Sequence, residues 1–206
     1  MPIIASSASK TMQTIPAGTH VARCVGMIHI GTIPNTFNGE SKLQNRVWVT
    51  WETPDETIEF KEGEGKKPYW ISREYTLSMH EKSKLREHVE GWRGKGLNET
   101  EARSFDIEKL LGQPCLLNII HNDKGYANIN GIASLPKGMS CSEQVSETRV
   151  LTYDNFNKEI FESLPQFLKD KMKESLEYRA LSNTANTVPV IDVNEDKVSE
   201  DTGLPF

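Results

Sequence analysis

The amino-acid sequence predicts a mainly β fold, a five-stranded barrel with one helix between its third and fourth strands. Several segments alternate apolar and polar residues, which is the pattern of half-buried strands. A charged segment with helical spacing interrupts them, and clusters of Gly, Asn and Asp separate them as turns. At 206 residues, the chain is long enough for one core of about 100 to 150 residues plus extensions.

The first three predicted strands span residues 19–33, 46–52 and 69–78. Alternation in the second strand places Trp51 on the face of its valines and Trp48 on the opposite face. In the third strand, Arg73 shares a face with Tyr75. Two polar, turn-rich segments, residues 35–44 and 54–68, are expected to be the connecting loops.

A helix is predicted next, over residues 79–92, because Leu85, Val89 and Trp92 recur at helical spacing among charged residues. Asn98 is a candidate helix cap, and a short helical stretch over residues 105–112 ends at a glycine. Two more strands follow, residues 114–122 and 125–135, joined by a hairpin turn. Three strands, a helix and two strands is the order of the OB-fold, a five-stranded Greek-key barrel that binds oligonucleotides.

The chain is expected to divide into four parts. They are a flexible leader (1–16), the OB-fold domain (17–138), a connector with a C-terminal helix over residues 163–181 (139–181), and a disordered acidic tail (182–206). The net charge of −5 is unevenly spread: the last 26 residues carry five acids and one lysine, so residues 1–180 carry only −1. A nearly neutral body removes the objection that an acidic protein does not bind nucleic acid.

Catalytic and metal-binding motifs are absent from the sequence. There is no GxxxxGKS loop, GxSxG, HExxH or paired-cysteine motif, and the three cysteines are widely spaced. We therefore expect no enzyme activity, no cofactor, no metal and reduced, packed thiols. No apolar run approaches the roughly 20 residues of a membrane span, and no signal peptide begins the chain, so we expect a cytoplasmic protein without a membrane partner.

Aromatic and basic residues are interleaved along the predicted strands and turns. Stacking of bases on aromatic rings beside phosphate-binding Lys or Arg is how proteins bind single strands without reading sequence. Each aromatic taken alone fits the core as well as it fits stacking, and Arg73 is either a phosphate contact at the barrel mouth or part of a buried ion pair. Trp48 is the strongest candidate because alternation separates it from the core face. The candidate DNA-binding residues are Arg46, Trp48, Lys66, Lys67, Trp70, Arg73, Tyr75, Arg93, Lys95, Lys124 and Tyr126.

The chain ends in SEDTGLPF, acids followed by a small apolar hook. Together with the strand order and the acidic tail, this ending resembles the single-stranded DNA-binding proteins of bacteria and their phages, whose acidic tails end in Ile-Pro-Phe or a close variant. In this sequence, Leu204, Pro205 and Phe206 occupy the positions of that terminal tripeptide. Glu200 and Asp201 stand for the acids, with two residues between acids and hook.

A second resemblance covers about residues 16 to 138. The stretches REYTLSMHEKSKLREHVEGWRGKG and FDIEKLLGQPCLLNI are similar to a widespread phage protein of replication and recombination gene clusters, regarded as an OB-fold single-strand binder. The resemblance implies a protein that coats single-stranded DNA in replication, recombination and repair, in the cytoplasm of a bacterial host. It implies that the tail recruits replication and recombination proteins, whose pockets take the Phe206 ring.

Two other functions stay open on the sequence alone. One is a phage recombination mediator or adaptor without strong DNA affinity, whose barrel binds protein. The other is a magnesium-dependent nuclease. The only sequence feature that supports it is the presence of acidic clusters such as Asp55 and Glu56, which could bind the metal. The sequence also leaves open whether the chain forms a homo-oligomer.

Overall fold

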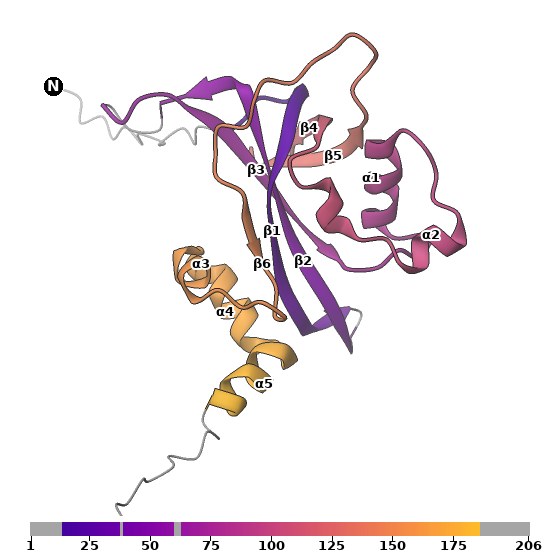
Figure 1. Ribbon diagram of the computed structural model, residues 1–206, viewed down its shortest axis with the longest axis vertical. Helices are drawn as coiled ribbons and strands as arrows, with labels where there is room; N and C mark the ends of the chain where they lie inside the picture. Colours follow the sequence, from indigo (N-terminus) through magenta and orange to yellow (C-terminus); the bar gives the residue numbers. More distant parts are fainter. Residues whose placement is uncertain (1–13, 38, 60–62, 186–206) are drawn as a thin grey trace, which may run out of the picture.

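The computed structural model describes residues 14–37, 39–59 and 63–185. Its centre is a six-stranded sheet in which the path β3-β2-β1-β4-β5 is antiparallel throughout and β6 pairs with β1 in parallel (Figure 1). The mainly β class is confirmed, and the sheet is not closed, because β3 and β5 are the two ends of the path. The strands are β1 (Gly18–Phe37), β2 (Glu40–Ile58), β3 (Lys67–Thr76), β4 (Pro114–His121), β5 (Ala127–Ala133) and β6 (Arg149–Leu151).

β1 and β2 form a hairpin much longer than the sequence predicts. The segment 35–44, expected to be a loop, continues both strands, with Asn35 opposite Lys42 in the register. The turn contains Gly39 with a φ of 80°, a left-handed conformation that glycine adopts without strain. β2 likewise runs to Ile58, through a bulge between Thr53 and Thr57, so part of the second expected loop is also strand.

The inner face of the sheet carries the main core. Val47, Val49 and Trp51 are buried there, as alternation predicts, and helix α1 (Lys84–Arg93) covers them. The rings of Trp51 and Trp92 lie 5.8 Å apart at their centroids. α1 begins five residues later than predicted because the Ser83 side chain accepts a hydrogen bond from the Arg86 amide and caps the helix.

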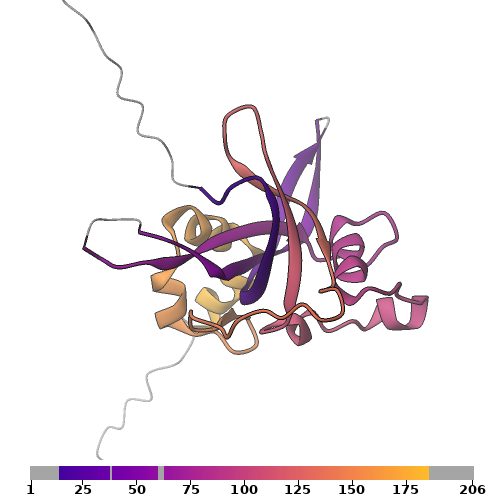
Figure 2. The ribbon, with the colours of Figure 1, turned by 90° about the horizontal axis from the view of Figure 1, so that it is seen from above.

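Short helical segments cover the rest of the inner side. α2 (Glu99–Arg103) starts at the predicted cap Asn98, which forms a capping box with Glu101. The predicted helical stretch at 105–112 contains one 3-10 turn, η1 (Ile107–Leu110). α1, α2 and η1 therefore form one layer, on the side of the sheet opposite the C-terminal helices in both views (Figures 1 and 2).

The C-terminal region covers the outer face of β1 and β2. Instead of one helix over 163–181, the structure has α3 (Lys158–Ser163), α4 (Gln166–Glu174) and α5 (Leu176–Ala185). The break is at Ser175, a fully buried residue whose hydroxyl donates to the Met172 carbonyl and accepts from the Tyr178 amide. β6, which the sequence does not predict, joins these helices in a second core with Ile28, Ile30, Leu151, Phe161, Leu168 and Met172.

Both ends of the described chain correct the expected domain boundaries. Ile15, placed in the flexible leader, is buried in the main core, and its carbonyl accepts a hydrogen bond from His121 at 2.8 Å. α5 continues to Ala185, beyond the predicted start of the tail at 182. The remainder of the leader and tail calls, residues 1–13 and 186–206, lies outside the described residues. None of the helices that the structure describes is long and apolar enough to cross a membrane.

Protonation of His88 is expected to destabilise the fold. His88 is a buried residue of α1, and its Nδ1 lies 2.7 Å from the Tyr75 hydroxyl. Burial, helped by Arg73 and Lys84, lowers the pKa of His88 to about 4. Because the unfolded chain binds this proton near pH 6.5, the free energy of unfolding should fall by up to about 3 kcal/mol as pH drops from 6.5 towards 4.

Urea unfolding at several pH values measures this dependence. The variant His88→Gln cannot titrate, so its stability should vary less than that of the native chain between pH 6.5 and 4, whatever its stability at pH 7. The same pH dependence in both proteins would show that other groups are responsible.

Candidate nucleic-acid interface

The outer faces of β2 and β3 form the floor of a groove beside α4. The register pairs Trp48 with Glu74, Thr50 with Ser72 and Glu52 with Trp70, all on the face opposite the main core. α4 contributes Phe167, whose ring lies edge-on to Trp48 with 5.4 Å between centroids. We call this space of about 280 Å³ the aromatic groove. Its lining includes Trp48, Thr50, Trp70, Ser72, Arg149 and Phe167.

Trp70 is the most accessible tryptophan of the groove. Its side chain is 46% exposed, whereas Trp48 is partly buried against the second core. The indole nitrogen of Trp70 donates to the Ser146 hydroxyl at 3.0 Å, and the Arg149 guanidinium lies 5.5 Å from its ring centroid. Trp70 therefore has an oriented ring with the Arg149 guanidinium over one face, and an aromatic ring near a cation is the combination that binds a base and its phosphate.

A second space, which we call the basic groove, adjoins the first along β3. It has a volume of about 430 Å³, and its lining contains four Arg and Lys side chains and one acid, Glu74. Its ionisable lining residues are Arg46, Arg73, Glu74, Tyr75, His80, Lys82 and Lys84. Trp48 of the aromatic groove and Glu74 of the basic groove are register partners, so the two grooves adjoin there, and together they take in residues 70–76 of β3, about 20 Å of strand.

Ion pairs and hydrogen bonds hold the basic groove in shape. Glu74 accepts from Arg46 at 2.8 Å and from Lys171 of α4 at 2.5 Å. Arg73 donates to the Ile129 carbonyl of β5, so its guanidinium bridges the two end strands of the sheet and lines the open groove. The Arg73 guanidinium also lies 5.5 Å from the centroid of the Tyr75 ring, and its contact with phosphate stays a prediction.

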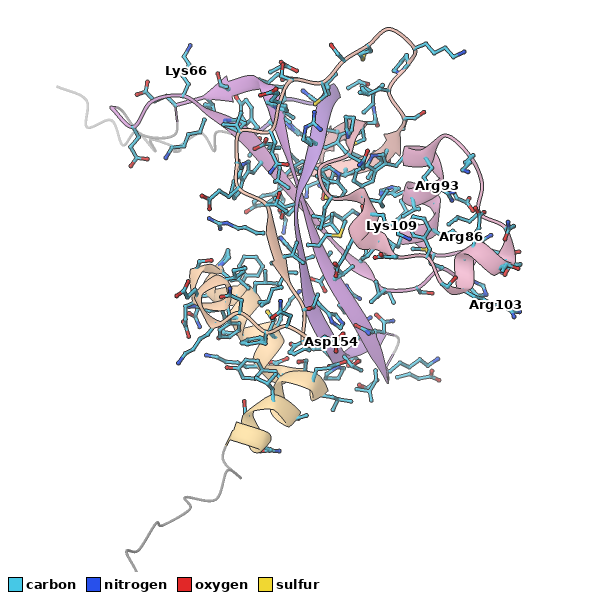
Figure 3. The ribbon with its side chains drawn as sticks, in the orientation of Figure 1. Lys66, Arg86, Arg93, Arg103, Lys109 and Asp154 are labelled. Atoms are coloured by element: carbon cyan, nitrogen blue, oxygen red, sulfur yellow. The ribbon has the colours of Figure 1, made fainter. Side chains whose placement is uncertain are left out.

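The remaining sequence-predicted residues lie elsewhere. Lys66 is exposed just before β3 and Lys67 is exposed at its first position, where Lys67 pairs with Glu64. Arg93, at the end of α1, packs over Phe105 and pairs with Glu101, and Lys95 follows it; Figure 3 places Lys66 and Arg93 on opposite sides of the molecule. Lys124 and Tyr126 are exposed in the turn between β4 and β5.

Tyr75 is a core residue. Its ring is only 3% exposed and lies against Trp51 and His88. Burial raises the pKa of its hydroxyl well above the ordinary value. A nucleic-acid base has no access to this ring, so the prediction that Tyr75 contacts DNA is wrong.

The structure adds groove residues that the sequence did not single out. Arg149 comes from β6 and Phe167 from α4, two elements of the C-terminal region that lie far from β3 in the chain. Lys82 and Lys84 flank the Ser83 cap of α1 and face the basic groove. The order of aromatic and basic residues within one strand carries no information on contacts between residues of different strands and helices.

Other chemistry has little support among the described residues. No group of three or more His, Cys, Asp or Glu side chains within residues 14–37, 39–59 and 63–185 is arranged to hold a metal ion. Cys24 and Cys115 are buried free thiols, and burial raises the pKa of Cys24 to about 12, so it stays protonated. A further cleft of about 450 Å³, between β1–β2 and the α2–η1 segment, includes none of the predicted site residues.

Comparison of the chain with family models, with curated proteins and with solved structures gave no match.

Proposed function

We propose that the protein binds single-stranded DNA without reading its sequence, along the outer faces of β2 and β3. The observation that carries the proposal is the exposed, oriented ring of Trp70 beside Arg149, in a groove that continues into a cluster of cations. Bases within a duplex are stacked on one another, so only an unpaired base can lie on this ring. Stacking accepts every base, which accounts for binding that is independent of sequence.

We propose further that the sheet is an OB-fold barrel. The path β3-β2-β1-β4-β5, with α1 between β3 and β4, supports this topology. β3 and β5 are not paired with each other, but the bond from Arg73 to the Ile129 carbonyl joins these two end strands, as fits a partly open barrel. OB-folds bind oligonucleotides on the face of strands 2 and 3, which is where the aromatic groove lies; the basic groove opens beside it, between β3 and the start of α1.

The biological role in replication, recombination and repair rests on the resemblance of the tail and strand order. So does the choice of DNA over RNA, since stacking and phosphate contacts are common to both. The tail residues Glu200, Asp201, Leu204, Pro205 and Phe206 lie outside the described residues. We propose that they recruit replication and recombination proteins, because an apolar ring beside acids and a terminal carboxylate matches an apolar pocket with a basic rim.

The basic groove should contribute a measurable part of the salt dependence. Lys82 and Lys84 are exposed, and replacing both with alanine should remove two phosphate contacts. The slope of log K against log salt for an oligo-dT should therefore become less steep by about 1.4. Fluorescence anisotropy of a labelled oligo-dT at several salt concentrations measures the slope.

The matched control replaces Arg103 and Lys109, two exposed bases of α2 and η1 that Figure 3 shows on the far side from Lys66. This double variant should keep the native slope. If both double variants change the slope equally, the lysines act through overall charge and the basic groove is not the phosphate path.

A further inference from the structure

A buried acid on β2 holds the chain segment that passes over Trp70. We call this segment, residues 141–149, the strap; the chain between β5 and β6 crosses the molecule from the side of α1 to the side of the C-terminal helices (Figure 1). Arg23 of β1 fixes its start by donating to the carbonyls of Cys141, at 3.3 Å, and Ser142, at 2.9 Å. The Ser142 hydroxyl also bonds to Asp55.

Glu52 fixes the middle of the strap. Its side chain is fully buried, and its two carboxylate oxygens accept hydrogen bonds from the amides of Val145, at 2.7 Å, and Ser146, at 3.0 Å. Removing a carboxylate from water costs free energy unless hydrogen bonds replace those to water, and here the two strap amides supply such bonds. The position of Ser146 is therefore set by Glu52.

Ser146 in turn holds Trp70. Its hydroxyl accepts the indole N–H of Trp70, the register partner of Glu52, at 3.0 Å. Arg149, at the end of the strap, lies over the same ring. One connected set of contacts thus runs from the buried acid through the strap to both the edge and the face of the exposed tryptophan.

We propose that Glu52 and Ser146 are positioning residues of the single-strand site. They fix the Trp70 ring before DNA binds, so that the base does not have to order the ring itself, and less affinity is lost to side-chain entropy. This inference rests on the proposed function and deepens it. Neither residue needs to touch the DNA.

A double-mutant cycle tests the route through Trp70. The variants are Ser146→Ala, Trp70→Ala and both together, and the measurement is the Kd of a labelled oligo-dT. Ser146→Ala alone should weaken binding about fivefold, and it should have no further effect in the Trp70→Ala background. Additive effects in the cycle would overturn the proposal, because they would mean that Ser146 acts on DNA by another path.

Three further variants sharpen the result. Ser146→Thr keeps the hydroxyl and should restore native affinity, while Thr148→Ala removes a strap hydroxyl that bonds to Gln144 and should leave affinity unchanged. Glu52→Gln keeps the size of the side chain but turns one acceptor into a donor, and should weaken binding as Ser146→Ala does. Native affinity in Glu52→Gln would remove Glu52 from the proposal.

Acrylamide quenching gives a readout that does not depend on DNA. The Trp70 contribution is the difference between the native chain and Trp70→Phe, and Ser146→Ala should make this contribution more accessible while Thr148→Ala should not. If the native chain fails to bind oligo-dT, the proposed function fails, and the quenching still decides whether Glu52 and Ser146 hold the ring. Unchanged quenching in Ser146→Ala would overturn the positioning role even where DNA binding is intact.

Discussion

Replacing Gly91 with alanine is expected to destabilise the protein by about 2 kcal/mol or more. Gly91 lies on the side of α1 that faces β5, where an added Cβ would overlap the Ile132 carbonyl oxygen. The Gly91 carbonyl also accepts the Ser134 amide at 2.9 Å, so helix and strand are joined at this point. α1 has no room to withdraw, because Val89 and Trp92 on either side are buried in the main core.

Chemical denaturation of the native chain and the variant measures this effect. The matched control is Gly96→Ala, since Gly96 has open space around its Cβ position. Helix propensity alone would make an alanine at Gly91 stabilising by about 1 kcal/mol, so the sign of the change separates the two explanations. A variant as stable as the native protein would mean that α1 does not approach β5 this closely.

Replacing Trp70 with alanine is expected to weaken oligo-dT binding by about 5-fold to 150-fold. This range is the 1 to 3 kcal/mol that one base stacked on an aromatic ring contributes, converted to a ratio of dissociation constants. The side chain is 46% exposed, so its removal should affect stability less than binding. Anisotropy of labelled oligo-dT gives the affinity, and thermal unfolding gives the stability.

Two controls accompany the Trp70 variant. Trp70→Phe keeps an aromatic face and should retain most of the affinity. Met139→Ala removes an apolar side chain of nearly equal exposure, 47%, that lies in the connector outside both grooves, and should bind as the native chain does. If Trp70→Ala and Met139→Ala bind alike, Trp70 is not a stacking platform.

Local sequence patterns predicted the properties that local geometry controls. Period-two alternation correctly placed Trp51 on the face of the main core and Trp48 on the opposite face, because successive side chains of a strand point to opposite faces. Helical spacing in the same way found the buried residues Leu85, Val89 and Trp92 of α1. The hairpin at 35–44 was missed because its strands extend with polar residues and have no apolar face to mark them.

Contacts between distant segments explain the rest of the differences. Glu52 lies on the outer face of β2, and it is buried there because the strap, 93 residues later at Val145, lies over it. Ser175 divides the expected C-terminal helix by using its hydroxyl as both donor and acceptor, a choice that nothing in the apolar spacing signals.

The candidate site was predictable in part for the same reason. Arg46, Trp48, Trp70 and Arg73 come together because they lie on two neighbouring strands. Arg93 ends α1, Lys95 follows it, and Lys124 and Tyr126 lie in the β4–β5 turn; none of these four residues lines either groove. Arg149 and Phe167 enter the aromatic groove from the C-terminal region, so only the three-dimensional structure could assign them.

Titration of the full chain into labelled oligo-dT over a range of salt concentrations is the most direct test of single-strand binding. Binding at about 50 mM salt is expected, with a slope of log K against log salt of about −0.7 for each phosphate contacted. A duplex of the same length should bind more weakly, because its bases cannot stack on Trp70. No binding of oligo-dT at about 50 mM salt would contradict the proposed function.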